Sequence, residues 1–181
     1  MTVLINNQDL IIFSSLPISH IINPNFRYTL GAKEICFTNP VYSWFFRSGR
    51  IIPIVRGAGI YQDSMTKAID ILDRGGWIHI FSEGKINQTT EITRFKWGVA
   101  RLIMESKVPV YIVPIYTSGL HEIQPLQRKS KMPRLWKKAY IRWGDPVDSR
   151  KFLDLVGGMD STNARIVITR EVQKMVQGLK V

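Results

Sequence analysis

The chain has 181 residues, of which 45% are hydrophobic, so its length and composition suit one domain with a sizeable core and exclude a disordered protein. A net charge of +11 favours a polyanionic partner, either nucleic acid or an anionic membrane, although composition alone leaves open a soluble basic protein with no charged partner. The single cysteine, Cys36, excludes an internal disulfide. No apolar run reaches the roughly 18 residues that span a bilayer and no secretory signal is evident, so we expect any membrane association to be peripheral or monotopic.

Patterns of the N-terminal part predict a strand and then a helix. Residues 2–5 have the pattern of a strand that begins at the initiator methionine, which leads us to expect an N-terminally incomplete domain. Asn39 suits a helix N-cap and Pro40 a first helical position, so a helix is expected from there to Ser48. We expect this helix to turn three apolar residues toward the core: Val41, Trp44 and Phe45.

Strands and helices then alternate, which predicts an α/β fold with a mainly parallel sheet flanked by helices. The whole of residues 1–181 is expected to form a single domain. The further strands are expected over residues 51–55, 77–81, 110–115 and 140–143, and the further helices over residues 65–72, 95–103 and 168–179.

Residues 81–87, FSEGKIN, are the most informative segment of the chain. The apolar strand 77–81 delivers Glu83, Gly84 and Lys85 to its exit, where α/β folds build anion and substrate sites. Glycine lets the backbone approach a ligand closely, and a lysine beside it can face a phosphate. Taken alone, however, an acid, a glycine and a lysine in sequence are more often an ordinary turn.

A second cationic loop follows the predicted strand 51–55. It begins with Arg56 and Gly57. If the strands before the two loops are neighbours, Arg56 and Lys85 hold one phosphate between them, the guanidinium as a fork and the ammonium as a point charge. The alternative interpretation is a surface turn with a solvated salt bridge.

The FSEGKIN segment resembles the phosphate-binding block of glycerophospholipid acyltransferases, usually written FPEG. With RFKWG at residues 94–98 it is similar to the tafazzin branch of that family. Residues 35–38, 56–62 and 108–115 resemble further segments of that branch in order and spacing, and the likeness runs from about residue 26 to residue 146. The resemblance implies a glycerolipid acyltransferase-like fold. In the family, the block that Glu83 and Gly84 resemble is associated with holding the glycerophosphate part of the acceptor lipid. Together with the two cationic loops, we therefore expect the substrate-binding residues to be Arg56, Gly57, Glu83, Gly84 and Lys85.

The family's catalytic element is a His and an Asp separated by four residues, and this sequence has none. No histidine is followed by Asp five positions later, whether His20, His79 or His121. An ungapped alignment puts the His position at Val3 and the Asp position at Gln8, whereas a short deletion puts Asn6 or Asn7 where the His belongs. An amide is no general base near neutral pH, so we expect no catalytic residues here and little or no turnover.

Serine, histidine and cysteine are residue types that often act in catalysis or metal binding, but their context in this sequence does not support such a role. Ser82 stands where the family has proline and has no activating base, so we interpret it as a substitution. His79 is expected to be a buried or half-buried structural imidazole. Three scattered histidines and one cysteine do not predict a metal site.

The segment 128–143 is basic. Its residues from Arg128 to Arg142 include seven cations and no acid, and aromatic residues lie among them. Such a mixture favours an anionic membrane surface. Binding of single-stranded nucleic acid and a merely solvated loop are the alternatives, and nucleic acid is less supported because no nucleic-acid motif accompanies the segment. The residues expected to contact the membrane are Arg128, Lys129, Lys131, Arg134, Trp136, Lys137, Lys138 and Tyr140.

The resemblance implies acyl transfer between a phospholipid and a lysophospholipid, of the 1-acylglycerophosphocholine O-acyltransferase or transacylase type. The implied setting is cardiolipin remodelling at a mitochondrial membrane, with cardiolipin and phosphatidylcholine as lipid partners. The tafazzin branch needs no coenzyme A, so no cofactor is expected. The alternative is a non-catalytic protein that binds anionic lipid or assembles with an intact homologue, and the sequence leaves open whether the chain is an enzyme.

Overall fold

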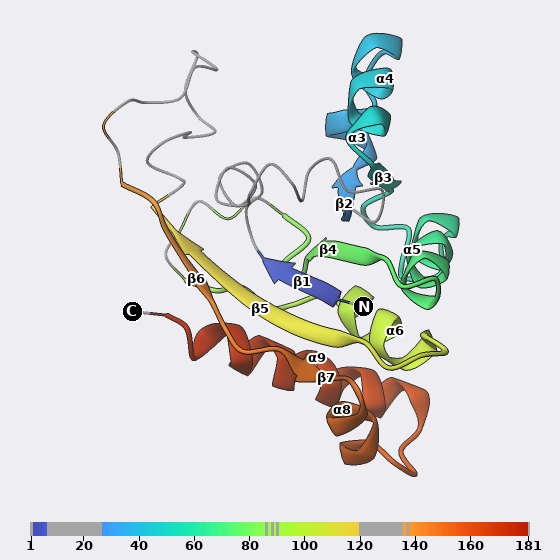
Figure 1. Ribbon diagram of the computed structural model, residues 1–181, viewed down its shortest axis with the longest axis vertical. Helices are drawn as coiled ribbons and strands as arrows, with labels where there is room; N and C mark the ends of the chain where they lie inside the picture. The colour runs from blue at the N-terminus through green and yellow to red at the C-terminus, as the bar shows by residue number, and fades with distance from the viewer. Residues whose placement is uncertain are drawn as a thin grey trace.

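The computed structural model of the protein describes residues 2–6, 27–85, 87, 89, 91–119, 136 and 138–180 (Figure 1). In these residues a seven-stranded sheet has the order β3-β2-β4-β1-β5-β6, with β7 paired to β5. Strands β1 to β5 run parallel, and β6 and β7 run antiparallel to β5. The predicted α/β fold with a mainly parallel sheet is confirmed. The strands are β1 (Thr2–Asn6), β2 (Tyr28–Ala32), β3 (Ile51–Ile54), β4 (Trp77–Phe81), β5 (Tyr111–Ser118), β6 (Tyr140–Trp143) and β7 (Val147–Asp148).

Helices cover the sheet on the side where the largest core cluster forms (Figure 1). Helix α5 packs on β3 and β4, α9 packs on β5, and α6 lies between α5 and α9. Ile78 and Ile80 alternate with His79 along β4, so both isoleucines reach this helical layer. The helices are α3 (Lys33–Cys36), α4 (Pro40–Ser48), α5 (Asp63–Asp73), α6 (Gly98–Glu105), α8 (Arg150–Leu155) and α9 (Ser161–Gln177).

Helix α4 forms where the sequence predicts a helix, but its apolar residues are turned to solvent and not toward the core. Asn39 Oδ1 accepts a hydrogen bond from Tyr42 N at 2.9 Å, and Pro40 is the first helical residue. The expectation that the apolar residues of α4 turn inward is wrong, because Val41, Trp44 and Phe45 are exposed. The reason is position: α4 packs against α3 and β3 and projects away from the sheet (Figure 1).

Arg101 is a buried cation that fastens α6 to the segment before α5. Its guanidinium donates to Glu105 Oε2 at 2.9 Å, to the Ile60 carbonyl at 2.5 Å and to Thr66 Oγ1 at 3.2 Å. It also lies 5.0 Å from the centre of the Tyr61 ring. These contacts fix the end of the loop that carries Arg56.

No described helix has both the length and the apolar character needed to cross a bilayer.

Candidate functional site

The two predicted cationic loops open on the same edge of the sheet. Strands β3, β2 and β4 are parallel, so the residues after Ile54, Ala32 and Phe81 all leave from their carboxyl ends. The two loop-bearing strands are separated by β2 and are not direct neighbours. Helix α3, which follows β2, therefore stands between the Arg56 loop and the Glu83 loop.

Glu83 is a buried carboxylate that is bound through only one of its oxygens. Its side chain is 1% exposed. Oε2 accepts hydrogen bonds from Asn87 Nδ2 at 2.8 Å, from Thr93 N at 3.3 Å and from Thr93 Oγ1 at 2.5 Å. Among the described residues nothing donates to Oε1, which is itself buried. A buried acceptor without a donor is costly, so this arrangement of the carboxylate calls for an explanation.

The RFKWG run is the support of the Glu83 loop. Lys96 N donates to the Ser82 carbonyl at 2.6 Å, and Phe95, which is buried, donates from its backbone N to Gln173 Oε1 at 3.1 Å. Gly84 has φ +67, and a Cβ there would meet Lys96 Cγ at 3.2 Å. A glycine is thus required by both the backbone conformation and the close packing. The two motifs singled out by sequence are one structural unit.

The Arg56 loop is closed by the side chain of Gln62. Gln62 Oε1 accepts from Val55 N at 3.0 Å, and Nε2 donates to the carbonyls of Val55 at 3.3 Å and Gly59 at 2.7 Å. Gly57 has φ +83, a conformation that glycine adopts without strain. The amide therefore holds the loop that presents Arg56.

Arg56 itself faces Glu34 on α3. The ion pair measures 3.2 Å, and both side chains are half exposed, so the pair contributes little free energy and can be exchanged for a stronger anion. Lys85 is exposed. A fork-shaped guanidinium and an ammonium thus stand on the same edge as the free oxygen of Glu83.

Of the residues expected to contact the membrane, three are described. Trp136, Lys138 and Tyr140 are exposed. The remaining five, Arg128, Lys129, Lys131, Arg134 and Lys137, lie outside the described residues.

His79 and Ser82 have the environments expected of structural residues. His79 is fully buried, and its ring lies 4.9 Å from that of Phe81. Ser82 is buried beside Glu83. In the described part of the chain no group of His, Cys, Asp and Glu side chains has the arrangement of a metal site.

The register of β1 bears on the two alignments of the missing catalytic pair. Val3 is paired with Ile78 inside the sheet, whereas Asn6 is paired with Phe81 at the carboxyl edge, next to the Glu83 loop. The alignment with a short deletion therefore puts the His position at the edge that carries the site. His20, His121 and Gln8 lie outside the described residues.

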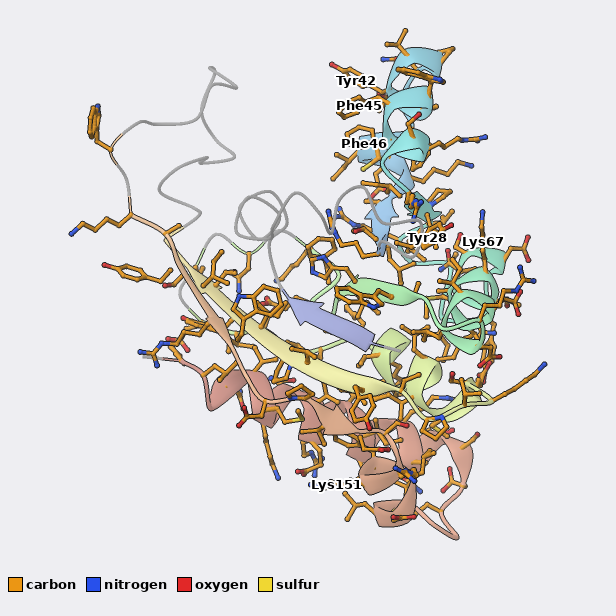
Figure 2. The ribbon with its side chains drawn as sticks, in the orientation of Figure 1. Tyr28, Tyr42, Phe45, Phe46, Lys67 and Lys151 are labelled. Atoms are coloured by element: carbon orange, nitrogen blue, oxygen red, sulfur yellow. The ribbon has the colours of Figure 1, made fainter. Side chains whose placement is uncertain are left out.

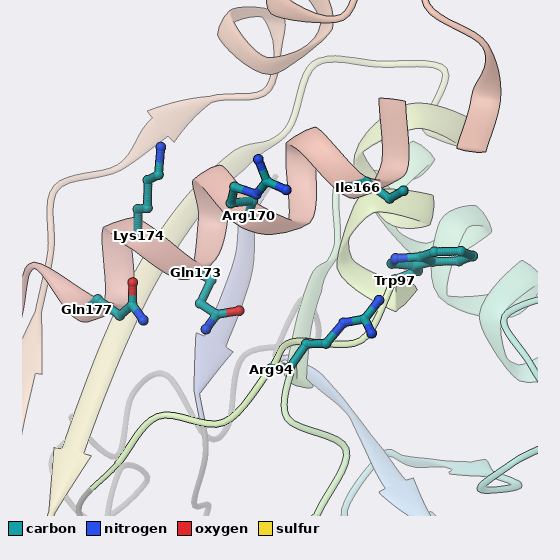
Figure 3. Close-up of a pocket in the computed structure, with 7 residues that line it drawn as sticks. All are labelled: Arg94, Trp97, Ile166, Arg170, Gln173, Lys174 and Gln177. Atoms are coloured by element: carbon teal, nitrogen blue, oxygen red, sulfur yellow. The ribbon is translucent and has the colours of Figure 1, made fainter. Parts of the chain in front are cut away.

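A basic groove between the RFKWG run and α9 was not predicted from the sequence (Figure 3). Its volume is about 440 Å³. Only the fold brings α9 beside residues 94–97, so no spacing along the chain could signal the groove. Its lining residues are Arg94, Trp97, Ile166, Arg170, Gln173, Lys174 and Gln177.

Comparison with known proteins agrees with this geometry. The sequence model of the Acyltransferase family matches residues 6–118. The chain is 44% identical over 147 residues to Taffazin of Dictyostelium discoideum, covering 78% of this chain and 51% of that protein. It is 37% identical over 173 residues to Tafazzin of Drosophila melanogaster, covering 93% of this chain and 45% of that protein. It is also 41% identical over 127 residues to N-acylphosphatidylethanolamine synthase of Arabidopsis thaliana, covering 67% of this chain and 45% of that protein.

Among solved structures, the 1-acyl-sn-glycerophosphate acyltransferase PlsC of Thermotoga maritima is similar in fold, with a TM-score of 0.61. At 20% identity the match covers 99% of this chain and 66% of that one. The fold and the sequence together define a glycerolipid acyltransferase domain. The chain belongs to the acyltransferase family, as a tafazzin-like member of its glycerophospholipid branch. It spans about half the length of the curated relatives it matches.

Proposed function

We propose that the carboxyl edge of the sheet binds the glycerophosphate part of a lysophospholipid, for acyl transfer from a phospholipid. The observation that carries this proposal is Glu83, whose Oε2 is bound by Asn87 and Thr93 while the buried Oε1 has no donor among the described residues. The free oxygen is suited to accept a hydrogen bond from a hydroxyl of the acceptor lipid.

Strand β2 separates the two cationic loops, but both leave the same edge of the sheet, where they would line the site of the lipid phosphate. Arg56 offers a guanidinium fork after β3, and Lys85 offers an ammonium after β4. At Gly57, which has positive φ, no atom lies within 4 Å of the place that a Cβ would take, so the backbone can approach the ligand there. Because charge-assisted hydrogen bonds from arginine to phosphate are strong, Arg56 would leave Glu34 for the ligand.

Acyl transfer itself requires a base that deprotonates the acceptor hydroxyl before it attacks the acyl carbonyl of the donor. In the family a His does this and an Asp orients it, and the 181 residues contain no His followed by Asp five positions on. His79 is buried beside Phe81 and is no substitute. The chain as written is therefore proposed to bind lipid with little or no turnover.

The proposed setting is cardiolipin remodelling at a mitochondrial membrane, with phosphatidylcholine as an acyl donor and no coenzyme A. Support comes from the similarity to two proteins named for tafazzin and from the net charge of +11. The chain would act as one domain, with the basic segment 128–143 against the lipid surface, where Trp136 and Tyr140 are exposed.

A non-catalytic role is the second candidate, favoured by the missing His and Asp. In that case the same edge binds anionic lipid, or the chain assembles with an intact homologue, without chemistry.

The test follows radiolabelled oleoyl transfer from phosphatidylcholine to monolysocardiolipin in mixed vesicles, with lipid binding measured on the same samples. We expect binding of the 181-residue chain to lysophospholipid, weaker binding by Glu83→Gln, and no transfer above vesicles alone. Transfer that Glu83→Gln abolishes would refute the claim that the chain lacks a base, and absence of any lipid binding would refute the proposed function.

A further inference from the structure

Helix α4 presents its apolar side to solvent. Val41 and Trp44 are each 71% exposed, Phe45 is 63% exposed and Tyr42 is 51% exposed. Ser43, between them in the chain, is only partly exposed. A helix that covers a core shows the opposite pattern, with its apolar stripe inward, so α4 is built to cover something other than this domain's own core.

Two of the outward residues of α4, Tyr42 and Phe45, pack against the ring of Phe46, which in turn lies near Phe37. The ring of Phe46 lies 6.5 Å from that of Phe37 and 5.3 Å from that of Phe45. Tyr42 packs edge-on to Phe46 at 6.3 Å. Figure 2 shows Tyr42, Phe45 and Phe46 along one side of the projecting helix. Little side-chain entropy then remains to be lost when these aromatic residues meet a partner.

The surroundings of α4 are cationic. Arg47 lies 5.9 Å from the ring of Phe37, and Arg50 lies 5.5 Å from the ring of Tyr28. Glu34 is paired with Arg56 at 3.2 Å. Residues 27–56 carry this single acid and five cations, namely Arg27, Lys33, Arg47, Arg50 and Arg56.

An apolar aromatic surface with a cationic rim complements an anionic bilayer, in which aromatic rings lie at the interface and basic residues contact head groups. The four outward side chains of α4 expose roughly 500 Å² in total, since a whole aromatic side chain has about 150–250 Å². A stable protein interface buries roughly 800 Å² per partner. The patch is therefore small for a second protein chain and sufficient for insertion into lipid.

We propose that α4 inserts Val41, Trp44 and Phe45 into an anionic lipid surface and thereby docks the domain on its substrate membrane. This proposal rests on the proposed function, because a lipid substrate brings the domain to a bilayer. It adds a second contact to the basic segment 128–143. In Figure 1 the helix projects from the end of the sheet that holds β2 and β3, the strands beside the Arg56 loop.

The binding test uses flotation of the 181-residue chain with vesicles of phosphatidylcholine and cardiolipin at a ratio of 4:1. We expect Trp44→Ser/Phe45→Ser to lower the partition coefficient by about tenfold or more, since both side chains would otherwise leave water. The matched control, Leu155→Ser/Met159→Ser, removes two exposed apolar residues near α8 and should change it by less than about twofold. Equal losses in the two double variants would overturn the proposal.

Quenching of tryptophan fluorescence by brominated phospholipid shows which residue enters the bilayer. Trp44→Phe keeps an apolar side chain and should retain binding while most of the quenching disappears. If Trp136→Phe removes the quenching instead, the basic segment inserts and α4 does not, although membrane binding by the proposed function survives.

If the wild type floats with no vesicle, the proposed function fails as well. A dimer in sedimentation velocity that Trp44→Ser/Phe45→Ser dissociates would assign α4 to a second copy of this chain and overturn the proposal.

Discussion

Asn87 Nδ2 donates to Glu83 Oε2 at 2.8 Å and so fixes a carboxylate that lies four residues earlier in the chain. The same amide donates to the Glu91 carbonyl at 2.5 Å, and its oxygen accepts from Thr89 N at 2.9 Å. Asn87 thereby joins the two ends of the segment that follows β4, from Glu83 to Glu91. Glu83 is held in one orientation, and no described residue donates to its Oε1, the atom that we propose binds the acceptor lipid.

Replacing Asn87 by alanine should weaken lysophospholipid binding. One of the three hydrogen bonds to Oε2 disappears, so the carboxylate of Glu83 is held less firmly, by Thr93 alone. We expect a loss of about three- to tenfold in affinity, the size of one typical hydrogen bond, because Thr93 still binds the carboxylate. Isothermal titration with short-chain lysophosphatidylcholine measures it, and the melting temperature of the same samples separates local from global effects. Unchanged affinity would show that Asn87 does not organise the site.

Gln62→Met should loosen the Arg56 loop while nearly preserving side-chain volume. The Val55 backbone and the Gly59 carbonyl lose their partner, at a cost of about 1–2 kcal/mol in the free energy of unfolding. Lysophospholipid affinity should fall as well, because Arg56 is then less well positioned. Urea denaturation measures the free energy of unfolding, and isothermal titration with short-chain lysophosphatidylcholine measures the affinity. A change in stability with full affinity would mean that Gln62 has no part in positioning Arg56.

Arg101→Met should be among the most destabilising single changes at a charged residue. It removes the donors to Glu105, Thr66 and the Ile60 carbonyl, for an expected loss of about 2–4 kcal/mol in the free energy of unfolding. Arg101→Lys should restore only part of this free energy of unfolding, since one ammonium cannot reach all three acceptors. Arg170→Met, on the exposed face of α9, is the control and should cost less than about 0.5 kcal/mol. Similar losses at both arginines would contradict the assigned role.

Asp160 makes the stability of α9 dependent on pH. Its Oδ1 accepts from Thr162 N at 2.9 Å and Asn163 N at 3.0 Å, and bonds to Asn163 hold the pKa of the carboxyl below its usual value. A lowered pKa in the folded state means that this stabilisation is present above the unfolded pKa near 3.8 and is lost as the pH falls through the folded pKa.

The test compares melting temperatures of wild type and Asp160→Asn from pH 7 down to pH 2. Asparagine also caps helices, but it does not titrate. We expect the advantage of the wild type to shrink below about pH 4, where the carboxyl gains its proton. A constant difference over the whole range would show that the cap does not depend on charge.

The parts of the fold that sequence predicted correctly are those in which local pattern and burial agree. Met65, Ala68, Ile69 and Leu72 follow helical spacing and are all buried in α5. Gly75, at φ +86, ends the turn after that helix as expected. Periodicity works there because the helix lies flat on the sheet and buries one face.

Sequence failed where burial depends on position in space. The pattern of α4 predicts that its apolar residues are buried, but a pattern alone cannot distinguish a face that packs on the core from a face that contacts a partner. The position of β2 between β3 and β4 is likewise a property of the topology, which the order of strands along the chain does not determine.

The candidate site was predictable only in part. Glu83, Gly84 and Arg56 could be chosen from charge, glycine and strand exits. The donor Thr93 could not, because ten residues separate it from Glu83 and no motif pairs the two. Gln62 and Arg101 also gave no signal, since glutamine and arginine with these neighbours usually lie at the surface.

The most direct measurement of the central claim is the affinity of the chain for short-chain lysophosphatidylcholine in Arg56→Ala and Arg74→Ala variants. Each variant loses one exposed positive charge, but Arg56 follows β3 at the carboxyl edge, whereas Arg74 precedes β4 at the opposite edge. If the carboxyl edge holds the phosphate, Arg56→Ala weakens binding by about tenfold or more and Arg74→Ala changes it by less than about twofold. Equal effects of the two variants would mean that net charge alone attracts the lipid, and the proposed site would be wrong.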